Sequence, residues 1–439
     1  MRYIFLAGFF MFGFLVMSQS YPGLSDDNYG GIHAVLVNPA NIADSRLKID
    51  VNLFSVQATV ATDYTTLTFD NIKKFGDDNF ALSPLQSNTV LANVDVLGTS
   101  LMFSINEKSS IGIITRLRGI NNYNNINGEL LESIVDGFPS NDFSFEQSNL
   151  DGTTHFWGEL GLSYGRVIYD YDEHYIKAGI TLKYLVGAGV AQGTSSALSG
   201  TYDATANTLA LDGDFSYLIS FDDDADETEL MKNLSPGHGL DIGLVYEYRS
   251  RNSRLSDVGD NPRATNKYKL KLGLSLLDYG AITYKDVEQT VYALNGTVAG
   301  NEVEEDFIDA LDNNFNSTTT SGDVTIALPA SLNFSLDYNL LHRVYIGLNY
   351  NQTLLKKNSF YNNNRLNLLT LTPRFETRFF SAYLPIGYSK VGGTAIGFGL
   401  RMGPLMIGSG SIISNLTSKK AQSANIFLGL KIPINHKNR

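Results

Sequence analysis

Residues able to do acid–base or nucleophilic chemistry are few in this sequence. Its 439 residues include six histidines and no cysteine, which excludes a thiolate nucleophile, a disulfide framework and a Cys-ligated metal. His174, His238 and His342 fall at or beside the ends of predicted strands, where water readily solvates the ring. Ser163 and His155 share a predicted strand but lie too far apart along it to form a hydrogen bond. We therefore expect no enzymatic activity and no cofactor.

Carboxylates that could bind a cation gather in one acidic run. Hard cations bind clustered carboxylates, but the spacing of this run does not match an EF-hand loop. A solvated run in an outer loop is the favoured interpretation, and no metal site is predicted. The net charge of −12 also disfavours nucleic acid as a partner, because phosphate binding requires a basic face. The run comprises Asp222, Asp223, Asp224, Asp226, Glu227 and Glu229.

The first twenty residues have the features of a secretory signal peptide. Arg2 supplies a positive charge, residues 3–17 are apolar, and small residues follow at Ser18 and Ser20. Cleavage after Ser18 and cleavage after Ser20 are both compatible with this pattern. The remaining chain contains no run of the roughly 18 apolar residues that a spanning helix needs.

The residues from 323 to 338 alternate between apolar and mostly polar side chains. Successive side chains of a strand point to opposite faces, so this segment is predicted to be one long strand with two different faces. Soluble strands average about 5–6 residues, whereas a tilted membrane strand needs about 9–11. The apolar face would consist of Val324, Ile326, Leu328, Ala330, Leu332, Phe334, Leu336 and Tyr338.

The same alternation recurs along the chain and predicts a fold class. We expect an all-β protein, a transmembrane antiparallel β-barrel of about 14 strands in a bacterial outer membrane, in contact with its lipid. Such barrels have short turns on the inner, periplasmic side and long loops on the outer side. The segments 61–88, 120–153, 188–237 and 289–322 are expected as the long outer loops. The connection 251–266 departs from this rule, because it is long but falls on the inner side. The strands are predicted at 47–60, 89–105, 110–119, 154–169, 174–187, 238–250, 267–288, 323–338, 342–354, 365–376, 379–389, 393–401, 404–412 and 424–434.

The side chains of this barrel can be sorted by strand parity. Residues 302–311 have the spacing of a short amphipathic helix in a loop, for which packing against its neighbours is the default expectation. Tyrosines are expected in two interfacial girdles, an inner one at Tyr246, Tyr248, Tyr268 and Tyr338 and an outer one at Tyr184, Tyr284, Tyr350 and Tyr388. Charged residues expected to face the lumen are Lys48, Asp50, Glu159, Lys177, Lys183, Asp241, Lys269, Lys271, Asp337, Arg343, Arg374 and Arg401.

The segment 30–44 contains the sequence Asn38-Pro39-Ala40 just before the first predicted strand. It resembles the start of FadL-like barrels, the long-chain fatty-acid transporters, and of the related PorV-type proteins of type IX secretion. Residues 403–409 and 427–433 extend the resemblance to an uncharacterised FadL-like outer-membrane family. The resemblance implies that residues 21–46 fold inward as a lumenal plug around the Asn38-Pro39-Ala40 turn, inside a barrel made by residues 47–439.

Two functions from different classes are compatible with this sequence. The first, which the resemblance implies, is passive uptake of small hydrophobic compounds through a plugged barrel. The second is a non-transporting scaffold or secretion component that binds other envelope proteins through its outer loops. A transporter is expected to have an apolar pocket beneath the outer loops, whereas a scaffold is expected to have a filled lumen.

Overall fold

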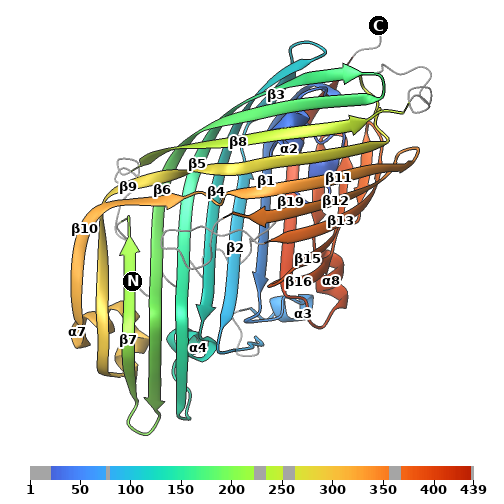
Figure 1. Cartoon of the computed structure of the whole chain (residues 1–439). Coiled ribbons are helices and arrows are strands. Elements are labelled where there is room, and N and C mark those ends of the chain that lie inside the picture. Colours follow the sequence, from blue (N-terminus) through green and yellow to red (C-terminus); the bar gives the residue numbers. More distant parts are fainter. Residues whose placement is uncertain (1–20, 76–79, 222–233, 251–262, 355–366, 437–439) are drawn as a thin grey trace.

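The computed structural model describes residues 21–75, 80–221, 234–250, 263–354 and 367–436. The predicted signal peptide, the acidic run and most of the inner connection 251–266 lie outside these residues. The described chain forms one antiparallel sheet that closes on itself where the first strand pairs with the last, from Leu47 opposite Asn435 to Ala61 opposite Ser423. Figure 1 shows the resulting barrel from the side.

Nineteen strands make up the sheet, but several are halves of one interrupted strand. The pairs β2 and β3, β7 and β8, β10 and β11, β14 and β15, and β16 and β17 each run in the same direction along shared neighbours. The wall therefore has fourteen strand positions, as the sequence predicts. The strands are β1 Leu47–Thr62, β2 Asn88–Leu97, β3 Ser100–Ser104, β4 Ser109–Ile126, β5 Phe143–Tyr171, β6 His174–Asp203, β7 Thr208–Ile219, β8 Ser235–Tyr248, β9 Leu270–Ala299, β10 Asn316–Ala327, β11 Ser331–Leu341, β12 Val344–Thr353, β13 Leu368–Glu376, β14 Phe380–Tyr383, β15 Ile386–Ser389, β16 Gly393–Ile396, β17 Phe398–Met402, β18 Leu405–Ser409 and β19 Ser423–Asn435.

The outer surface of the barrel is apolar and exposed. Along β5, Leu160 and Leu162 are more than half exposed, whereas Glu159 and Ser163, which flank this pair, are buried. Large exposed apolar side chains continue this band around the other strands. A soluble protein does not leave so wide an apolar surface in water, whereas a lipid-facing wall requires one. The protein is an outer-membrane β-barrel.

Short helices lie inside the barrel or at its outer end. Within the described part of the chain, no helix is long and apolar enough to span a bilayer. The helical elements are η1 Leu24–Asp26, α2 Ile32–Val35, η2 Pro39–Ile42, α3 Phe69–Ile72, α4 Gly128–Asp136, α6 Gly300–Glu305, α7 Phe307–Asn314 and α8 Ile412–Thr417.

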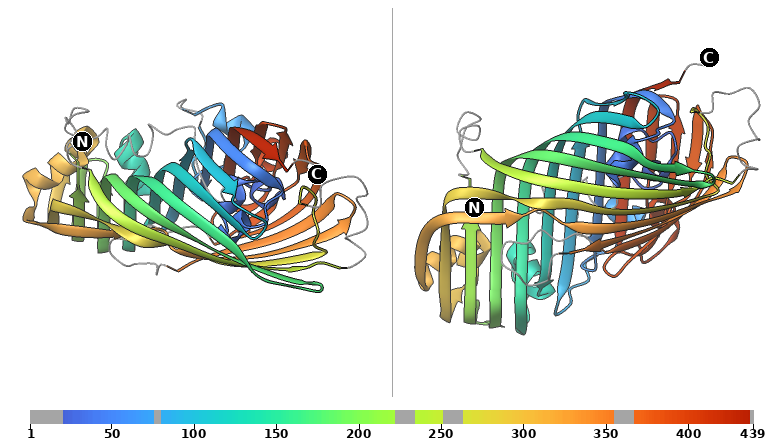
Figure 2. Two further views of the ribbon diagram at one scale, coloured as in Figure 1. Left: turned by 90° about the horizontal axis from the view of Figure 1, so that it is seen from above. Right: turned by 45° about the horizontal axis from the view of Figure 1, so that its top comes forward.

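One side of the barrel projects well beyond the membrane. β6 and β9 have 30 residues each, about three times the 9–11 that a membrane strand needs. Figures 1 and 2 show these long strands projecting past the shorter strands β12 to β19. The helices α4, α6 and α7 cover the projecting sheet and enclose an apolar core with it. The outer segments 120–153, 188–237 and 289–322 were expected as loops and instead largely continue the strands.

The predicted amphipathic helix 302–311 is divided in two by Asp306. The Asp306 carboxylate caps α7 by accepting hydrogen bonds from the amides of Ile308 and Asp309, and it thereby starts a new helix. Val303 and Leu311 are buried in the extramembrane core. The expectation that this segment packs against its neighbours is confirmed.

The predicted long strand 323–338 is interrupted at residues 328–330, and its apolar face switches sides there. Ile326 and Leu328 are completely buried inside the barrel, while Thr325 between Val324 and Ile326 is exposed. Past the break, Phe334 is exposed to lipid and Asp337 is buried. The prediction of one continuous lipid-facing row is therefore wrong. Two of the expected girdle tyrosines are corrected as well, because Tyr268 and Tyr284 are buried inside the barrel.

Candidate functional site

Residues 21–46, the N-terminal segment, lie within the barrel. Their helix η2 contacts β4, β5, β6 and β8, while α2 contacts β1 and β3. Ile32, Ala40 and Ile42 are completely buried. Because the segment touches strands on several sides of the closed wall, the wall encloses it.

Asn38 and Pro39 start the helix η2. The Asn38 backbone is extended, and its side-chain oxygen accepts a hydrogen bond from the amide of Ala40 at 3.0 Å. Pro39 occupies the first helical position, where a missing N–H costs nothing and a fixed φ favours the helix. The Asn-Pro-Ala sequence therefore sets a compact turn.

This turn is hydrogen-bonded to the barrel wall. The Asn38 side-chain amide donates to the carbonyl oxygens of Leu244 at 3.1 Å and Leu274 at 3.3 Å, on the adjacent strands β8 and β9. The carbonyl oxygen of Val37 accepts hydrogen bonds from Ser275 at 2.6 Å and Asn333 at 3.2 Å. Buried amides and carbonyls require such partners, so the turn has a defined seat on the wall.

Three glycines make room for that seat. Gly165, Gly179 and Gly243 are direct cross-strand neighbours on β5, β6 and β8, and we call them the glycine row. A Cβ on Gly243 would lie 2.0 Å from the Asn38 oxygen, and one on Gly179 would lie 2.3 Å from the Pro39 carbonyl carbon. Larger side chains here would displace the turn. The row could not be identified from the sequence, because it depends on the alignment of three strands.

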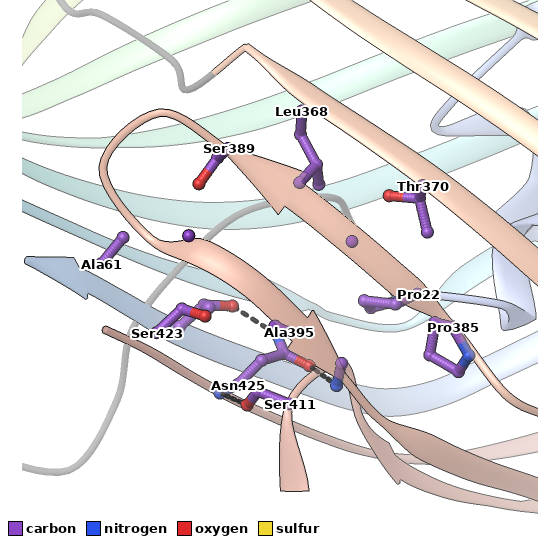
Figure 3. Close-up of a pocket in the computed structure, with 14 residues that line it drawn as sticks. Pro22, Ala61, Leu368, Thr370, Pro385, Ser389, Ala395, Ser411, Ser423 and Asn425 are labelled. Atoms are coloured by element: carbon purple, nitrogen blue, oxygen red, sulfur yellow. Dashed lines mark hydrogen bonds between the residues drawn. The ribbon is translucent and has the colours of Figure 1, made fainter. Parts of the chain in front are cut away.

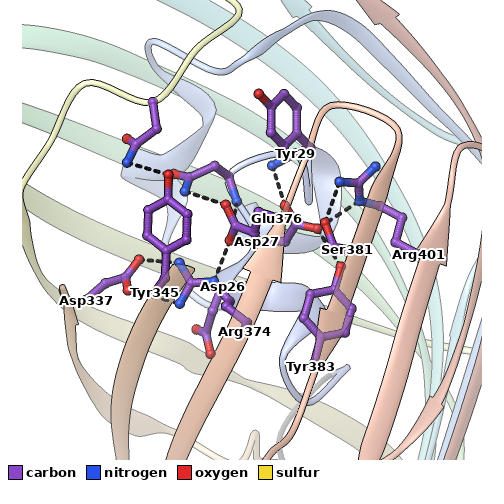
Figure 4. Close-up of polar contacts among 12 residues, drawn as sticks. Asp26, Asp27, Tyr29, Asp337, Tyr345, Arg374, Glu376, Ser381, Tyr383 and Arg401 are labelled. Carbon is purple, nitrogen blue, oxygen red and sulfur yellow. Dashed lines mark hydrogen bonds and ion pairs between the residues drawn. The ribbon is translucent and has the colours of Figure 1, made fainter. Parts of the chain in front are cut away.

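Nearer the start of the segment, Asp27 contacts the opposite side of the wall. Arg401 of β17 donates from Nε to the Asp27 carboxylate at 2.8 Å, and the Tyr383 hydroxyl donates to the same oxygen. Asn28 donates to Glu376 of β13 at 2.8 Å. Figure 4 shows this group of polar contacts around the start of the segment.

The inner end of the segment is held by a second set of charges. Arg249, directly after β8, lies 2.6 Å from the Asp44 carboxylate and 2.5 Å from Glu247. Lys177 of β6 lies 3.1 Å from Glu247 and donates to the carbonyl oxygen of Ala43. Arg46 lies 3.0 Å from Asp44. These side chains are buried, so each charge depends on its partners.

Burial and neighbouring charges shift the titration of groups in the segment. Burial disfavours the Asp27 carboxylate, but Arg401 and the Tyr383 hydroxyl outweigh that effect and hold the pKa of Asp27 below its ordinary value. Burial also lowers the pKa of His33, well below its ordinary value. His33 is therefore neutral at pH 7, with Nε2 3.0 Å from the Ser55 hydroxyl.

A layer of buried charges crosses the lumen farther out. Lys183 of β6 lies 2.9 Å from Asp241 and 2.6 Å from Asp278. Arg118 of β4 lies 2.9 Å from both Glu159 and Asp278. We call this group, which six wall strands contribute, the central charge layer. Its members are Asp95, Arg116, Arg118, Glu159, Lys183, Asp241 and Asp278.

Several residues predicted to face the lumen do so. Asp50, Lys177 and Asp337 are buried inside, and Lys271 is half-buried with its ammonium 5.8 Å from the buried ring of Tyr268. The structure brings Glu159, Lys183 and Asp241 together in the central charge layer, Asp337 and Arg374 into an ion pair, and Arg401 against Asp27.

Three of the predicted lumenal residues lie elsewhere. Lys48 is exposed, because a register shift between Leu47 and Ile49 moves it off the lumenal parity. Arg343 is exposed in the β11–β12 turn, where its φ is 65°. Lys269 lies at the inner rim, with its ammonium against the carbonyl oxygens of Asn339 and Leu340.

Sequence reasoning also missed Asp27, Glu376 and Lys431, which hold the N-terminal segment. Lys431 lies on the lumenal face of the last strand, β19, and is completely buried. Its ammonium donates to the carbonyl oxygens of Tyr29 at 2.7 Å and Gly30 at 2.9 Å, and lies 3.2 Å from Asp50. A polar residue on the lumenal parity was the available signal, but its partner could not be read from the sequence.

The outer half of the lumen is less polar. Trp157, Leu185, Ile282 and Leu328 form a buried apolar cluster there with residues of β4, β7 and β10. On the other side of the lumen, a cavity of about 50 Å³ lies between β1, β13, β15, β16 and β19. Figure 3 shows the side chains that line it, which include Ala61, Ser389 and Pro22 of the N-terminal segment.

Comparison with solved structures returns a hydrocarbon channel, a toluene transporter and a FadL homologue, each similar to this chain over most of its length. A TodX monoaromatic hydrocarbon channel deltaS2 mutant has 11% identity and a TM-score of 0.47, with 95% of this chain and 97% of that chain covered. The toluene transporter TbuX of Ralstonia pickettii has 10% identity and a TM-score of 0.46, with 97% and 100% covered. A Pseudomonas aeruginosa FadL homologue has 11% identity and a TM-score of 0.43, with 95% and 98% covered.

The sequence comparisons give a family without an assigned activity. No curated protein is significantly similar to this chain in sequence. The model of a family of unknown function, DUF5723, matches residues 39–410, from Pro39 in the N-terminal turn to the end of the β17–β18 hairpin region. Because this match covers most of the barrel, the chain belongs to the family of unknown function DUF5723.

Proposed function

We propose that this protein takes up small hydrophobic compounds passively, through a lumen that the N-terminal segment plugs and that opens when this segment moves. Residues 21–46 would form the plug, and the Asn38-Pro39-Ala40 turn would attach this plug to the wall. The barrel formed by the rest of the mature chain would provide the path through the membrane.

One observation carries this proposal. The N-terminal segment lies inside the wall and contacts strands on several sides of it, yet its residues 21–46 contribute no strand to the sheet. Hydrogen bonds and ion pairs from side chains, such as Asn38 to β8 and β9 and Asp27 to Arg401, hold it in place. Its displacement would therefore leave the hydrogen bonds between wall strands intact, which suits a gate.

The lining of the outer lumen supports an apolar cargo. The lumen of an outer-membrane barrel is ordinarily polar, whereas Trp157, Leu185 and Ile282 belong to a packed apolar cluster inside this one. A hydrophobic compound leaving water would gain free energy on contact with these side chains. The central charge layer would disfavour its further passage until the side chains rearrange.

A scaffold that binds other envelope proteins is the second candidate function. It is favoured by the extramembrane sheet, in which Leu130, Leu209, Tyr292 and Leu311 form a core separate from the lumen. Uptake does not require a rigid projection of this size. In a scaffold, this projection would provide the surface that binds the partner protein.

Planar-bilayer conductance and uptake of hydrophobic probes distinguish the two candidates. Deletion of residues 24–42 removes most of the plug. Gly243→Leu keeps the whole segment but displaces the Asn38-Pro39-Ala40 turn from the wall. Gly322→Leu is the matched control, because a Cβ on Gly322 would have no neighbour within 4 Å. If the segment is a gate, both test variants raise conductance and probe uptake, and the control does not. Conductance that stays near zero in both folded variants would refute uptake and favour the scaffold.

A further inference from the structure

A groove of about 440 Å³ crosses the lipid-facing surface of β8, β9, β11 and β12. The backbone of Gly273 and Ser335 lies between its two banks, each a row of outward side chains that are neighbours across the strands. One bank consists of Leu244, Leu274, Phe334 and Tyr350, and the other of Tyr246, Leu272, Leu336 and Leu348.

The position of the groove restricts what can occupy it. Leu274 and Phe334 are almost half exposed, and the groove is continuous with the apolar band that contacts the bilayer core. Hydrocarbon chains are the molecules present at this depth. The groove offers one hydrocarbon chain a place between its two banks.

Cationic side chains lie on the inner side of this groove. Lys269 precedes Leu272 of the groove by three residues, or roughly 10 Å along an extended chain. Arg343 precedes Leu348 by five residues, or roughly 17 Å. Arg343 is exposed, and the Lys269 ammonium lies 4.6 Å from the centre of the Tyr338 ring, which faces outward. Both cations therefore lie at the level of the inner membrane surface.

We propose that this face binds one phospholipid of the inner leaflet. An acyl chain lies in the groove between the two apolar banks, and the phosphate contacts Lys269 and Arg343. The two observations are independent: the groove selects a hydrocarbon chain by its shape and depth, and the cations select an anionic headgroup by charge. The site is on the outside of the wall and does not depend on passage through the lumen.

Native mass spectrometry of the folded barrel in a nonionic detergent tests the site. The probes are phosphatidylglycerol and a diacylglycerol with the same acyl chains. Phe334→Ala shortens one bank of the groove, and Lys269→Gln with Arg343→Gln removes the cations. Phe398→Ala and Lys48→Gln are matched controls, because Phe398 is another outward phenylalanine and Lys48 another exposed lysine near the inner end. Heat-modifiable migration on gels establishes that each variant is folded.

The proposal predicts retention of one phosphatidylglycerol per barrel as detergent rises, with much weaker retention of diacylglycerol. Both the groove variant and the cation variant should lose retention several-fold, and both controls should match the parent protein. Equal retention by test and control variants would overturn the site. Equal retention of diacylglycerol and phosphatidylglycerol would overturn the role of Lys269 and Arg343.

Discussion

Arg401 donates a hydrogen bond to Asp27 at 2.8 Å, although 374 positions separate the two residues in the chain. Both side chains are buried, so neither is solvated by bulk water. Arg401 is also fixed from the wall side, since its guanidinium donates to the carbonyl oxygen of Thr377 and to the Ser381 hydroxyl. The pair therefore joins the start of the N-terminal segment to a rigid part of the barrel.

Asp27→Asn should destabilise the barrel by roughly 3 kcal/mol, because removal of one partner leaves the Arg401 charge buried without compensation. Urea unfolding followed by fluorescence measures this change, with Trp157 as the single tryptophan of the chain. Asp323→Asn, at an exposed position of β10, is the control and should leave the midpoint unchanged. Equal midpoints for the two variants would contradict the assigned role of the pair.

The contribution of Asp27 should depend on pH. Its pKa lies below the ordinary value because Arg401 and Tyr383 favour the carboxylate despite burial. A carboxyl group with a depressed folded-state pKa stabilises the protein above its unfolded pKa of about 3.9, and that contribution is lost as pH falls through the folded value. The difference in unfolding free energy between the parent and Asp27→Asn should thus shrink below about pH 4. A difference that grows on acidification would contradict this assignment.

Asn38→Ala removes two hydrogen bonds to the wall and the cap of η2. Since each buried carbonyl that loses its donor costs about 1–3 kcal/mol, the N-terminal segment should be released more readily than in the parent protein. Limited proteolysis of the folded barrel measures this release as faster cleavage within residues 21–46. Asn314→Ala is a suitable control, because Asn314 is exposed and donates to the carbonyl oxygen of Ala310 in the extramembrane part of the chain. Unchanged cleavage in Asn38→Ala would mean that the turn is held by other contacts.

The switch of faces at residues 328–330 predicts that the same substitution has a severe effect on folding at one position and a mild effect at the adjacent one. Ile326→Arg places a charge in the buried apolar cluster and should prevent stable folding, since an unpaired buried charge costs several kcal/mol. Thr325→Arg places the same charge on an exposed surface and should be mild. The yield of heat-modifiable barrel compares them. A lower yield for Thr325→Arg than for Ile326→Arg would contradict the switch of faces and favour the continuous strand that the sequence alone predicts.

The number of wall positions could be predicted because lipid imposes a simple rule on every strand. Leu160 and Leu162 must be apolar outside, and Glu159 can be charged inside, so the period of two is visible without knowledge of neighbours. This alternation does not distinguish an apolar side chain that faces lipid from one that faces an apolar part of the lumen. Ile326 has the same side chain as a lipid-facing residue but lies inside, and Pro329 was the available signal that a central strand is interrupted there.

The site depends on register, which a single sequence does not reveal. Gly165 and Gly179 belong to one hairpin, but Gly243 is distant in the chain and joins their row only when β8 is aligned with β6. The same limit applies to Asp27, whose partner comes from β17. The Asn-Pro-Ala turn could be located in advance because its conformation is set by neighbouring residues, but its contacts on the wall could not.

Lys431 has a consequence for how the barrel is assembled. It belongs to the last strand, β19, while Asp50 belongs to the first, and both contact the N-terminal segment through Gly30 or its neighbours. With the segment absent, the completely buried Lys431 ammonium would lose two of its acceptors. Joining of the first and last strands is therefore most favourable when the segment is already in place. The segment thus bridges the first and last strands from inside and adds to the stability of the closed wall.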